Sequence, residues 1–205
     1  MKYAAAAALG AFAPFAIADG LDYDYLEAGY LQGEIDDSFF RTDFDGWELR
    51  GSMEHNDWLL LGGYEELTAG PLTSFGTLET RFISSFLRVG GGYRFMLGEH
   101  FALAPSAGFL RGSEEIERDG FCAVCDFGDQ SDTDTGYFVN LDFRAQLLDN
   151  VEAEFEHRFT NVFSNRLNDW RLDVRYHFTP QIAVSAGYRD YEGDTATGVT
   201  LRWHY

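Results

Sequence analysis

The chain has 205 residues and a formal net charge of −19. This length suits one domain with a substantial core. The negative charge excludes nucleic acid as a partner, because phosphate binding needs clusters of basic side chains.

Residues 1–18 have the features of a secretory leader. Lys2 supplies one positive charge, a short Ala-rich run follows, and Ala16-Ile17-Ala18 has the small-residue pattern of a cleavage site. The run is too short to span a membrane as a helix, which requires about 20 apolar residues. We therefore expect a signal peptide over residues 1–18, cleaved after Ala18, and a single domain over residues 19–205.

The rest of the chain alternates between apolar and polar residues with a period of two, which is typical of strands with two different faces. From Trp170 to Phe178, apolar side chains share one face and charged side chains share the other. Ten segments of this kind lie near residues 21–32, 45–54, 58–66, 82–96, 101–111, 136–147, 151–160, 168–178, 181–190 and 195–205. Most have about the 9–11 residues of a tilted transmembrane strand. We predict an all-β, antiparallel barrel of ten strands, with eight strands as the alternative.

The connections between these segments alternate in length. Four are tight, at 55–57, 97–100, 148–150 and 179–180. Between them lie longer connections at 33–44, 67–81, 112–135 and 161–167, and the last connection, 191–194, is short. Short periplasmic turns and longer extracellular loops are typical of outer-membrane barrels.

Two fold classes fit this alternation. An exported soluble β protein would turn its apolar face inward, whereas a membrane barrel turns it toward lipid. The leader, the loop lengths and the aromatic terminus favour the membrane barrel, with Trp203 and Tyr205 at the lipid interface. The polar face then forms the barrel interior, and its charged residues are Glu27, Glu48, Arg50, Arg88, Arg94, Asp142, Arg144, Glu154, Arg171, Asp173, Arg175 and Arg202.

Several segments resemble the small outer-membrane barrels of xanthomonads and related bacteria, namely 20–30, 45–52, 62–64 and 92–94. More distantly, the chain is similar to the OmpA transmembrane domain and to OmpX. The resemblance implies the outer membrane of a Gram-negative bacterium, and Tyr205 resembles the aromatic terminus read by the barrel-assembly machinery. This family has no agreed activity, so the resemblance supplies no catalytic or cofactor-binding residues.

Three functions are compatible with the sequence. We favour a structural or surface-interaction role, with outer-membrane lipid, lipopolysaccharide and an extracellular partner as contacts. The alternative is a narrow gated channel for small solutes, because the interior charges either fill the lumen or rearrange to let ions pass. An enzyme is less favoured, since His157 and Ser164 have no spacing that makes them a catalytic pair.

The longest connection holds the two cysteines, Cys122 and Cys125, among acidic residues. Export through an oxidising compartment favours a disulfide between them, with reduced thiols or a metal or redox role as alternatives. The acidic residues either face solvent or bind Ca²⁺ or Mg²⁺ weakly in contact with lipopolysaccharide. They are Glu114, Glu115, Glu117, Asp119, Asp126, Asp129, Asp132 and Asp134.

Overall fold

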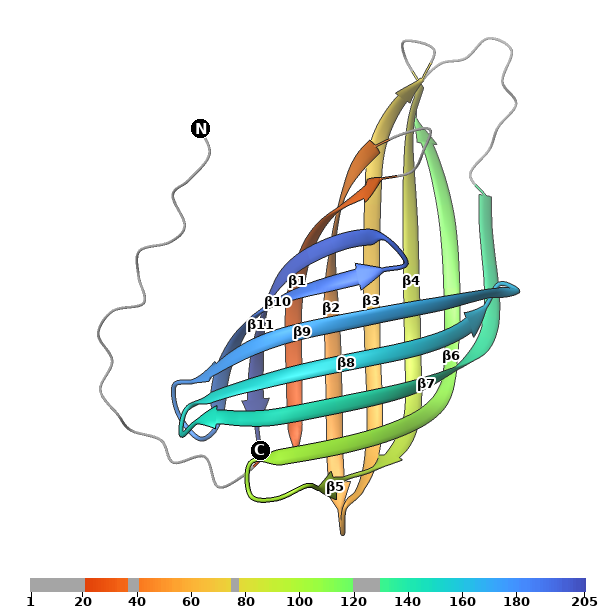
Figure 1. Cartoon of the computed structure of the whole chain (residues 1–205). Coiled ribbons are helices and arrows are strands. Elements are labelled where there is room, and N and C mark those ends of the chain that lie inside the picture. Colours follow the sequence, from red (N-terminus) through yellow and green to blue (C-terminus); the bar gives the residue numbers. More distant parts are fainter. Residues whose placement is uncertain (1–20, 37–40, 75–77, 120–129) are drawn as a thin grey trace, which may run out of the picture.

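The computed structural model describes residues 21–36, 41–74, 78–119 and 130–205. They form one antiparallel sheet that closes on itself as β1 pairs with β11 and β4 pairs with β6 (Figure 1). The strands are β1 (Tyr25–Asp36), β2 (Arg41–His55), β3 (Trp58–Ser74), β4 (Leu78–Tyr93), β5 (Phe95–Met96), β6 (Phe101–Asp119), β7 (Gln130–Leu148), β8 (Val151–Val162), β9 (Asn165–His177), β10 (Ile182–Tyr191) and β11 (Asp194–His204).

The predicted ten-stranded barrel is confirmed, because β4 and β5 are two parts of one barrel strand. The strand is interrupted at Arg94, whose N–H donates to the carbonyl of Asp57 at 2.8 Å. Its guanidinium also lies 2.7 Å from a carboxylate oxygen of Glu54. The register against β6 is the same on both sides of Arg94, with Gly92 opposite Ser106 and Phe95 opposite Leu103.

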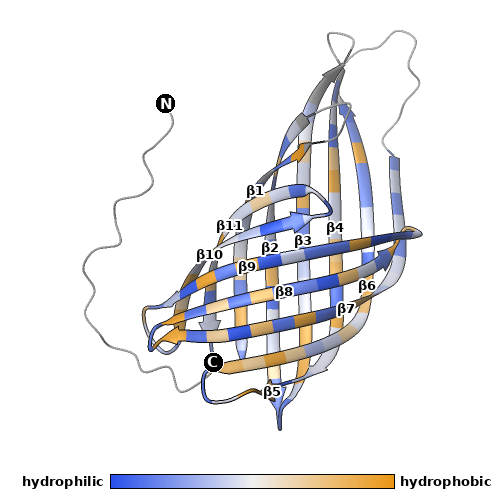
Figure 2. Ribbon diagram, viewed as in Figure 1, coloured by the Kyte–Doolittle hydropathy of each residue, from blue (hydrophilic) through white to orange (hydrophobic). Residues whose placement is uncertain are grey.

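The two faces of the sheet differ as the alternation predicts. Along β9, Arg171, Asp173 and Arg175 are buried inside, while Leu172 and Val174 are exposed outside. The same interchange of apolar and polar residues recurs along neighbouring strands (Figure 2). A polar interior and an apolar exterior are the reverse of a soluble barrel and suit a lipid surrounding.

Outward-facing aromatic pairs lie toward both ends of the strands. Trp47 and Tyr64 have ring centroids 4.8 Å apart near one end, and Trp203 and Tyr205 have centroids 5.8 Å apart near the other. Further pairs are Tyr137–Phe159 and Trp170–Tyr188 toward the first end, and Trp58–Tyr93, Phe101–Phe143 and Tyr176–Phe178 toward the second. Amphipathic rings at two levels are typical of a membrane-spanning barrel. The role of the terminal pair in assembly stays a prediction.

The strand ends at four connections, and the start of the first strand, differ from the predicted boundaries. The connections predicted at 33–44, 67–81, 112–135 and 161–167 are largely strand, since β3 continues to Ser74 and β6 to Asp119. The apolar–polar alternation fades there because both faces of the sheet are polar, yet pairing continues, for example between Ser113 and Thr133. The first strand begins at Tyr25 rather than at residue 21, because residues 21–24 turn into the lumen.

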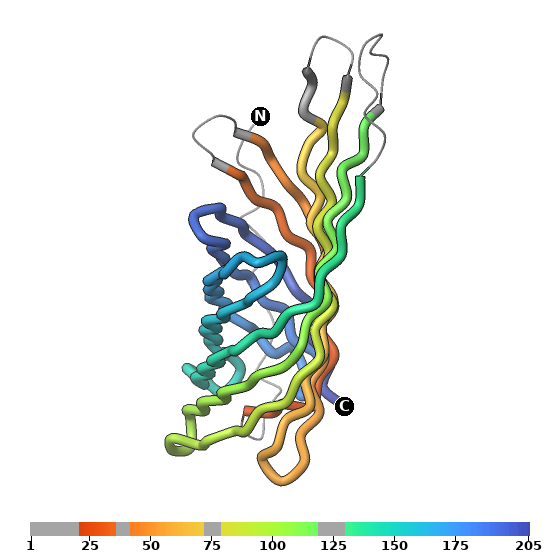
Figure 3. Tube along the Cα trace, turned by 90° about the vertical axis from the view of Figure 1, so that its right-hand side faces the viewer, coloured from red at the N-terminus to blue at the C-terminus, as the bar shows by residue number. Residues whose placement is uncertain are grey.

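Four strands extend beyond the closed barrel. Pairing between β2 and β3 ends at Phe44 and Ala69, and pairing between β7 and β8 ends at Tyr137 and Asn161. Beyond these points β3, β4, β6 and β7 continue together, while the hairpin of β1 and β2 diverges from them (Figure 3). We call residues 70–74, 78–86, 110–119 and 130–136 the extension.

Both open edges of the extension are protected against pairing with another strand. On β7, the N–H groups of Thr133 and Thr135 each donate to the carboxylate of the preceding residue, Asp132 and Asp134, at 2.8 Å. On β3, Pro71 follows directly after the point where β2 leaves, and proline has no N–H to offer. An edge whose backbone N–H groups are already hydrogen-bonded or absent cannot readily pair with a strand of another chain.

Two predicted features lie outside the described residues: the signal peptide over 1–18, and the pair Cys122 and Cys125. Within the described ranges, no helix is long and apolar enough to cross a membrane.

The facing of β9 can be tested at Val174, which is 52% exposed on the outer surface between Trp170 and Tyr176. We expect Val174→Arg to lower the free energy of unfolding by about 2–4 kcal/mol, because it places a charge against lipid near the midplane. Refolding into lipid vesicles under a urea titration measures this loss.

The matched control is Asn168→Arg, also exposed on the outer face of β9 but beyond Trp170. Here the cost should be at most about 1 kcal/mol, as near the interface. Equal losses in the two variants would contradict the assigned membrane level.

Candidate functional site: the lumen ion-pair network

The N-terminal segment Leu21–Asp24 closes the periplasmic end of the lumen. Leu21 and Tyr23 are buried against Leu59, Ala102 and Ala104. Two arginines hold the segment by its backbone: Arg94 donates to the carbonyl of Leu21 and Arg144 to that of Asp22, each at 3.2 Å. The Arg144 guanidinium also lies 3.9 Å from the centroid of the Tyr23 ring, a cation–π contact.

Asp22 ties this segment to the last strand. Its carboxylate accepts the N–H of Asp24 at 2.8 Å and lies 3.6 Å from Nδ1 of His204. Burial opposes ionisation, but the nearby His204 ring and the hydrogen bond from the Asp24 N–H outweigh it and lower the pKa of Asp22 below its ordinary value. Asp22 is therefore held as a carboxylate.

The centre of the lumen is organised around Glu154 on β8. Its carboxylate is fully buried and within ion-pair distance of arginines on four different strands. These arginines are Arg50 at 3.6 Å, Arg144 at 3.5 Å, Arg175 at 2.9 Å, Arg202 at 2.9 Å, and Arg171 in direct contact. One carboxylate thus links β8 to β2, β7, β9 and β11.

Glu27 on β1 has the same role on the opposite wall. It accepts from Arg202 at 2.7 Å and from Arg175 at 3.1 Å, and it contacts Arg50 directly. Because Arg202 and Arg175 also bind Glu154, they connect β1 to β8 across the lumen. Ion pairs therefore cross the interior of the barrel, in addition to lining its wall.

The network continues toward the outer end. Arg189 on β10 bonds Glu48 on β2, Arg88 on β4 bonds Glu65 on β3 at 3.1 Å, and Arg158 on β8 lies 2.6 Å from Asp169 on β9. Close packing requires a small residue at one point: a Cβ at Gly187 would fall on Oδ1 of Asp173. We call all these groups together the lumen network.

Every cation of the lumen network is an arginine, and Lys2 is the only lysine in the chain. A guanidinium offers five donors in a planar fork and stays charged when buried, so one side chain can serve several carboxylates. A lysine ammonium is a point charge that loses its proton more readily on burial. The arginines thus suit a dry, multiply bridged interior.

The structure places all twelve predicted interior residues inside the barrel or at its lower end. It adds Glu65, Glu152, Glu156, Arg158, Asp169 and Arg189, which the sequence analysis did not assign to the interior. The signal was present for Glu152, Glu156 and Arg158, because they alternate in phase with Glu154. Glu65 shares its face with Leu59 and Leu61, so no polar stripe marks it.

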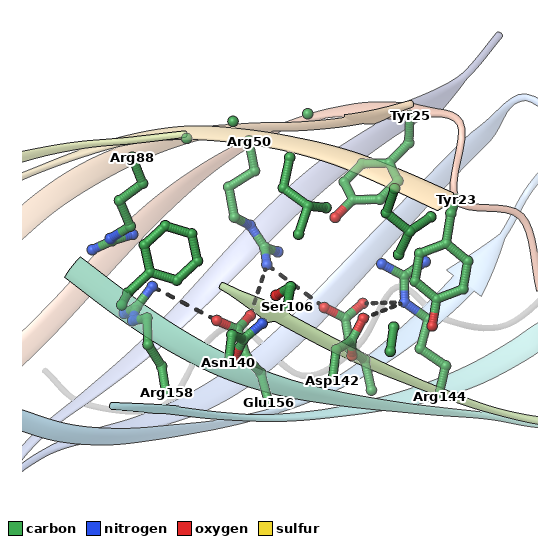
Figure 4. A pocket seen from close by; sticks show the side chains of 18 residues that line it. Tyr23, Tyr25, Arg50, Arg88, Ser106, Asn140, Asp142, Arg144, Glu156 and Arg158 are labelled. Carbon is green, nitrogen blue, oxygen red and sulfur yellow. Dashed lines mark hydrogen bonds and ion pairs between the residues drawn. The ribbon is translucent and has the colours of Figure 1, made fainter. Parts of the chain in front are cut away.

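A cavity of about 80 Å³ remains beside the network, along the wall formed by β3, β4 and β6. Figure 4 shows Arg88 and Arg158 toward one end, Tyr23 and Arg144 at the other, and Ser106 and Asn140 between them. The Ser106 hydroxyl, Asn140 Oδ1 and Asp142 Oδ1 are buried without protein hydrogen-bond partners in the described structure. The volume admits several waters, since one requires about 10–15 Å³.

Two apolar clusters lie at the outer end of the lumen. Phe44, Ala69 and Ala196 pack on one side, with Tyr191 beside them. On the other side Leu110, Phe138 and Val162 pack with Phe86, Phe163 and Leu167. The β8–β9 turn brings Phe163 there with φ of 52°, and the Asp134 carboxylate accepts its N–H at 2.7 Å. A bulky residue in this left-handed region needs such support.

The structure does not bring His157 and Ser164, the two residues considered for catalysis, into a catalytic arrangement. His157 is exposed on the outer face of β8, in register with Leu141 and Trp170. Ser164 lies in the β8–β9 turn, with φ of 60°. In the described part of the chain, no group of three or more His, Cys, Asp or Glu is placed to hold a metal ion.

The polar, bridged interior and apolar exterior define an outer-membrane β-barrel. The sequence model of the outer membrane protein beta-barrel domain family matches residues 3–202, and the chain belongs to this family. Membership indicates the outer membrane of a Gram-negative bacterium.

Solved barrels share the fold at low identity. The translocator domain of the autotransporter NalP from Neisseria meningitidis has a TM-score of 0.59 at 9% identity, over 92% of this chain and 91% of that one. Ail of Yersinia pestis, solved with the heparin analogue sucrose octasulfate, has a TM-score of 0.47 at 15% identity, over 87% of this chain and 97% of that one. Neisserial surface protein A has a TM-score of 0.48 at 11% sequence identity, over 88% of this chain and 96% of that one. Among curated proteins, nothing matches the chain.

The contribution of the lumen network can be measured at Arg175, which is fully buried and bonds Glu152 at 2.6 Å. We expect Arg175→Met to lower the free energy of unfolding by about 3–5 kcal/mol, because it removes one buried cation from three buried carboxylates, Glu27, Glu152 and Glu154. Adding Glu152→Gln should recover part of the loss. Urea unfolding in detergent micelles gives both values.

Arg166→Met is the control, since Arg166 is an exposed arginine at the other end of β9. It should change stability by no more than about 0.5 kcal/mol. If Arg175→Met were equally mild, the network would not hold the barrel together.

Proposed function

We propose that this barrel is a closed membrane anchor that presents the extension outside the cell for envelope or surface interaction. The observation that supports this most strongly is the lumen network, in which Arg175 and Arg202 join opposite walls through Glu27 and Glu154. Apolar clusters also lie at both ends of the same lumen. A barrel of ten strands lies between barrels filled by side chains and porins with a water channel, and this one is filled.

The extension supplies the surface for interaction. Its edges are protected, so a partner would bind its faces or the segments at its tip rather than add a strand. Exposed acidic side chains gather there: Glu79, Glu114, Glu115, Glu117 and Asp132. Charge complementarity favours a partner with a basic surface.

A narrow channel for small solutes is the second candidate, supported by the cavity of about 80 Å³. Conduction through it would require movement of Tyr23 at the lower end and of Phe163 at the outer end, since each packs in an apolar cluster. The partnerless hydroxyl of Ser106 and the carboxylate oxygen of Asp142 would then contact the solute.

Planar-bilayer recording separates the two candidates. We expect the purified barrel to give no steady single-channel steps, because ion pairs and apolar clusters fill the lumen. A Tyr23→Gly, Phe163→Gly variant removes one side chain from an apolar cluster at each end of the lumen and tests whether a continuous path can open. Steady conductance of the unmodified protein would overturn the closed-anchor proposal in favour of the channel.

The interaction role can be tested in a deletion strain complemented with variants. We expect the triple change Glu114→Gln, Glu115→Gln, Glu117→Gln to reduce surface attachment to the level of the deletion strain, with unchanged outer-membrane abundance and heat-modifiable migration. Glu99→Gln, an exposed acid in the opposite turn at 97–100, is the matched control and should attach normally. Normal attachment of the deletion strain itself would overturn the proposal.

A further inference from the structure

We infer that the outer face of the extension, at its base, binds the phosphate groups of lipopolysaccharide through Arg111. This inference rests on the proposed placement of the extension outside the outer membrane, and it goes further by naming a residue and a ligand chemistry.

Arg111 lies at the outer boundary of the apolar surface of the barrel. Along the outer face of β6, the residues from Phe101 to Phe109 are apolar at every second position, and Arg111 is the next outward residue. Phe109 is 71% exposed and pairs with Tyr137, while Leu87 opposite Arg111 is 56% exposed. Arg111 therefore stands where the apolar surface ends.

The surroundings of Arg111 contain no acid. Its register partners are Leu87 on β4 and Thr135 on β7. The next outward positions are Phe109 below and Ser113 above, and the diagonal neighbours are Ser85, Val89, Thr133 and Tyr137. In a chain with a net charge of −19, this is a cation without a neighbouring countercharge.

Most other arginines of the described chain differ from Arg111 in this respect. Those of the lumen network are paired with carboxylates, and Arg81, outward on β4, stands in register with the exposed Glu117. The exception is Arg166, exposed at the start of β9, which also has no ion-pair partner among the described residues but stands one outward position further from the apolar surface, beyond Asn168. For Arg111 there is no ion-pair partner among the residues that the structure describes. Its positive charge is available to a ligand.

The chemistry of the patch fits a phosphorylated sugar at a lipid surface. A guanidinium binds phosphate through two parallel hydrogen bonds. One position further from the apolar surface, Ser85, Ser113 and Thr133 form a row of hydroxyls across three strands. Hydroxyls can hydrogen-bond sugar rings, while Phe109 and Leu87 contact acyl chains below. In lipopolysaccharide the acyl chains lie innermost and the phosphorylated sugars lie at the lipid surface, which matches this order along the strands.

The opposite side of the rim does not offer the same site. Asp43 and Asp45 face outward and are exposed on β2, above Trp47. Carboxylates at this level repel phosphate. The contact is therefore not expected at β2, and we place it on the side of β4, β6 and β7.

The test measures binding of the purified full barrel, in nanodiscs, to lipopolysaccharide with intact phosphates and to the same material after enzymatic dephosphorylation. We expect Arg111→Gln to bind phosphorylated lipopolysaccharide about tenfold more weakly, the size expected for losing a charge-assisted hydrogen bond. Binding of the dephosphorylated form should not change. Arg81→Gln, on the same face but beside Glu117, is the matched control and should bind like the unmodified barrel.

Three results would overturn the inference: unchanged binding by Arg111→Gln, an equal loss toward the dephosphorylated form, or an equal loss in Arg81→Gln. Heat-modifiable migration shows that each variant is folded. Surface attachment and conductance, measured in parallel, report on the proposed function, so its failure is distinguishable from failure of the phosphate contact.

Discussion

The structure depends on the neutralisation of buried charge by bridging ion pairs. An isolated ion in a dry interior costs several kcal/mol even after relaxation, so charged groups in a narrow barrel require partners close at hand. Here each carboxylate at the centre serves several guanidinium groups, and Arg175 and Arg202 each reach both Glu27 and Glu154. The pairs cross the lumen, so the opposite walls are joined directly. Closure of the barrel completes the network, since Glu27 on β1 and Arg202 on β11 come together where these two strands pair.

This arrangement explains the two regimes along the strands. Where the outer face meets lipid, apolar residues cover it and the charges turn inward, as for Val174 and Arg175. Beyond the aromatic pairs both faces of the sheet are polar, so the alternation disappears although the ladder of pairs continues to Asp119 on β6. The same strands therefore serve as membrane wall and as exposed sheet. The change takes place at Phe109 and Arg111, within three residues of one strand.

The sequence was sufficient to predict the barrel, its ten strands and the interior position of the charged residues, because the period of two is strong wherever one face meets lipid. It was insufficient for the ends of β3, β6 and β7, where that contrast is lost. It also missed the turn of Leu21 and Tyr23 into the lumen, since the alternation of this segment continues that of β1 and only its contacts with Arg94 and Arg144 distinguish it. The sequence also could not predict the ion pairs within the lumen network. Which carboxylate each arginine contacts depends on the register of strands across the barrel. Arg189 and Glu48 lie 141 residues apart in sequence.

The distribution of arginines gives the membrane part and the exposed part different constraints. Inside, most guanidinium groups are fixed by carboxylates on two or more strands, so a change at one position disturbs several neighbours. Outside, Arg111 stands among apolar and hydroxyl side chains and is fixed by nothing in the described structure except its strand. Selection for the fold alone would not require a cation at that boundary, since an uncharged polar residue would also mark the end of the apolar surface. A charge retained there without a protein partner is explained by a partner in the surrounding leaflet, and a phosphate of lipopolysaccharide has the sign and the position to supply it.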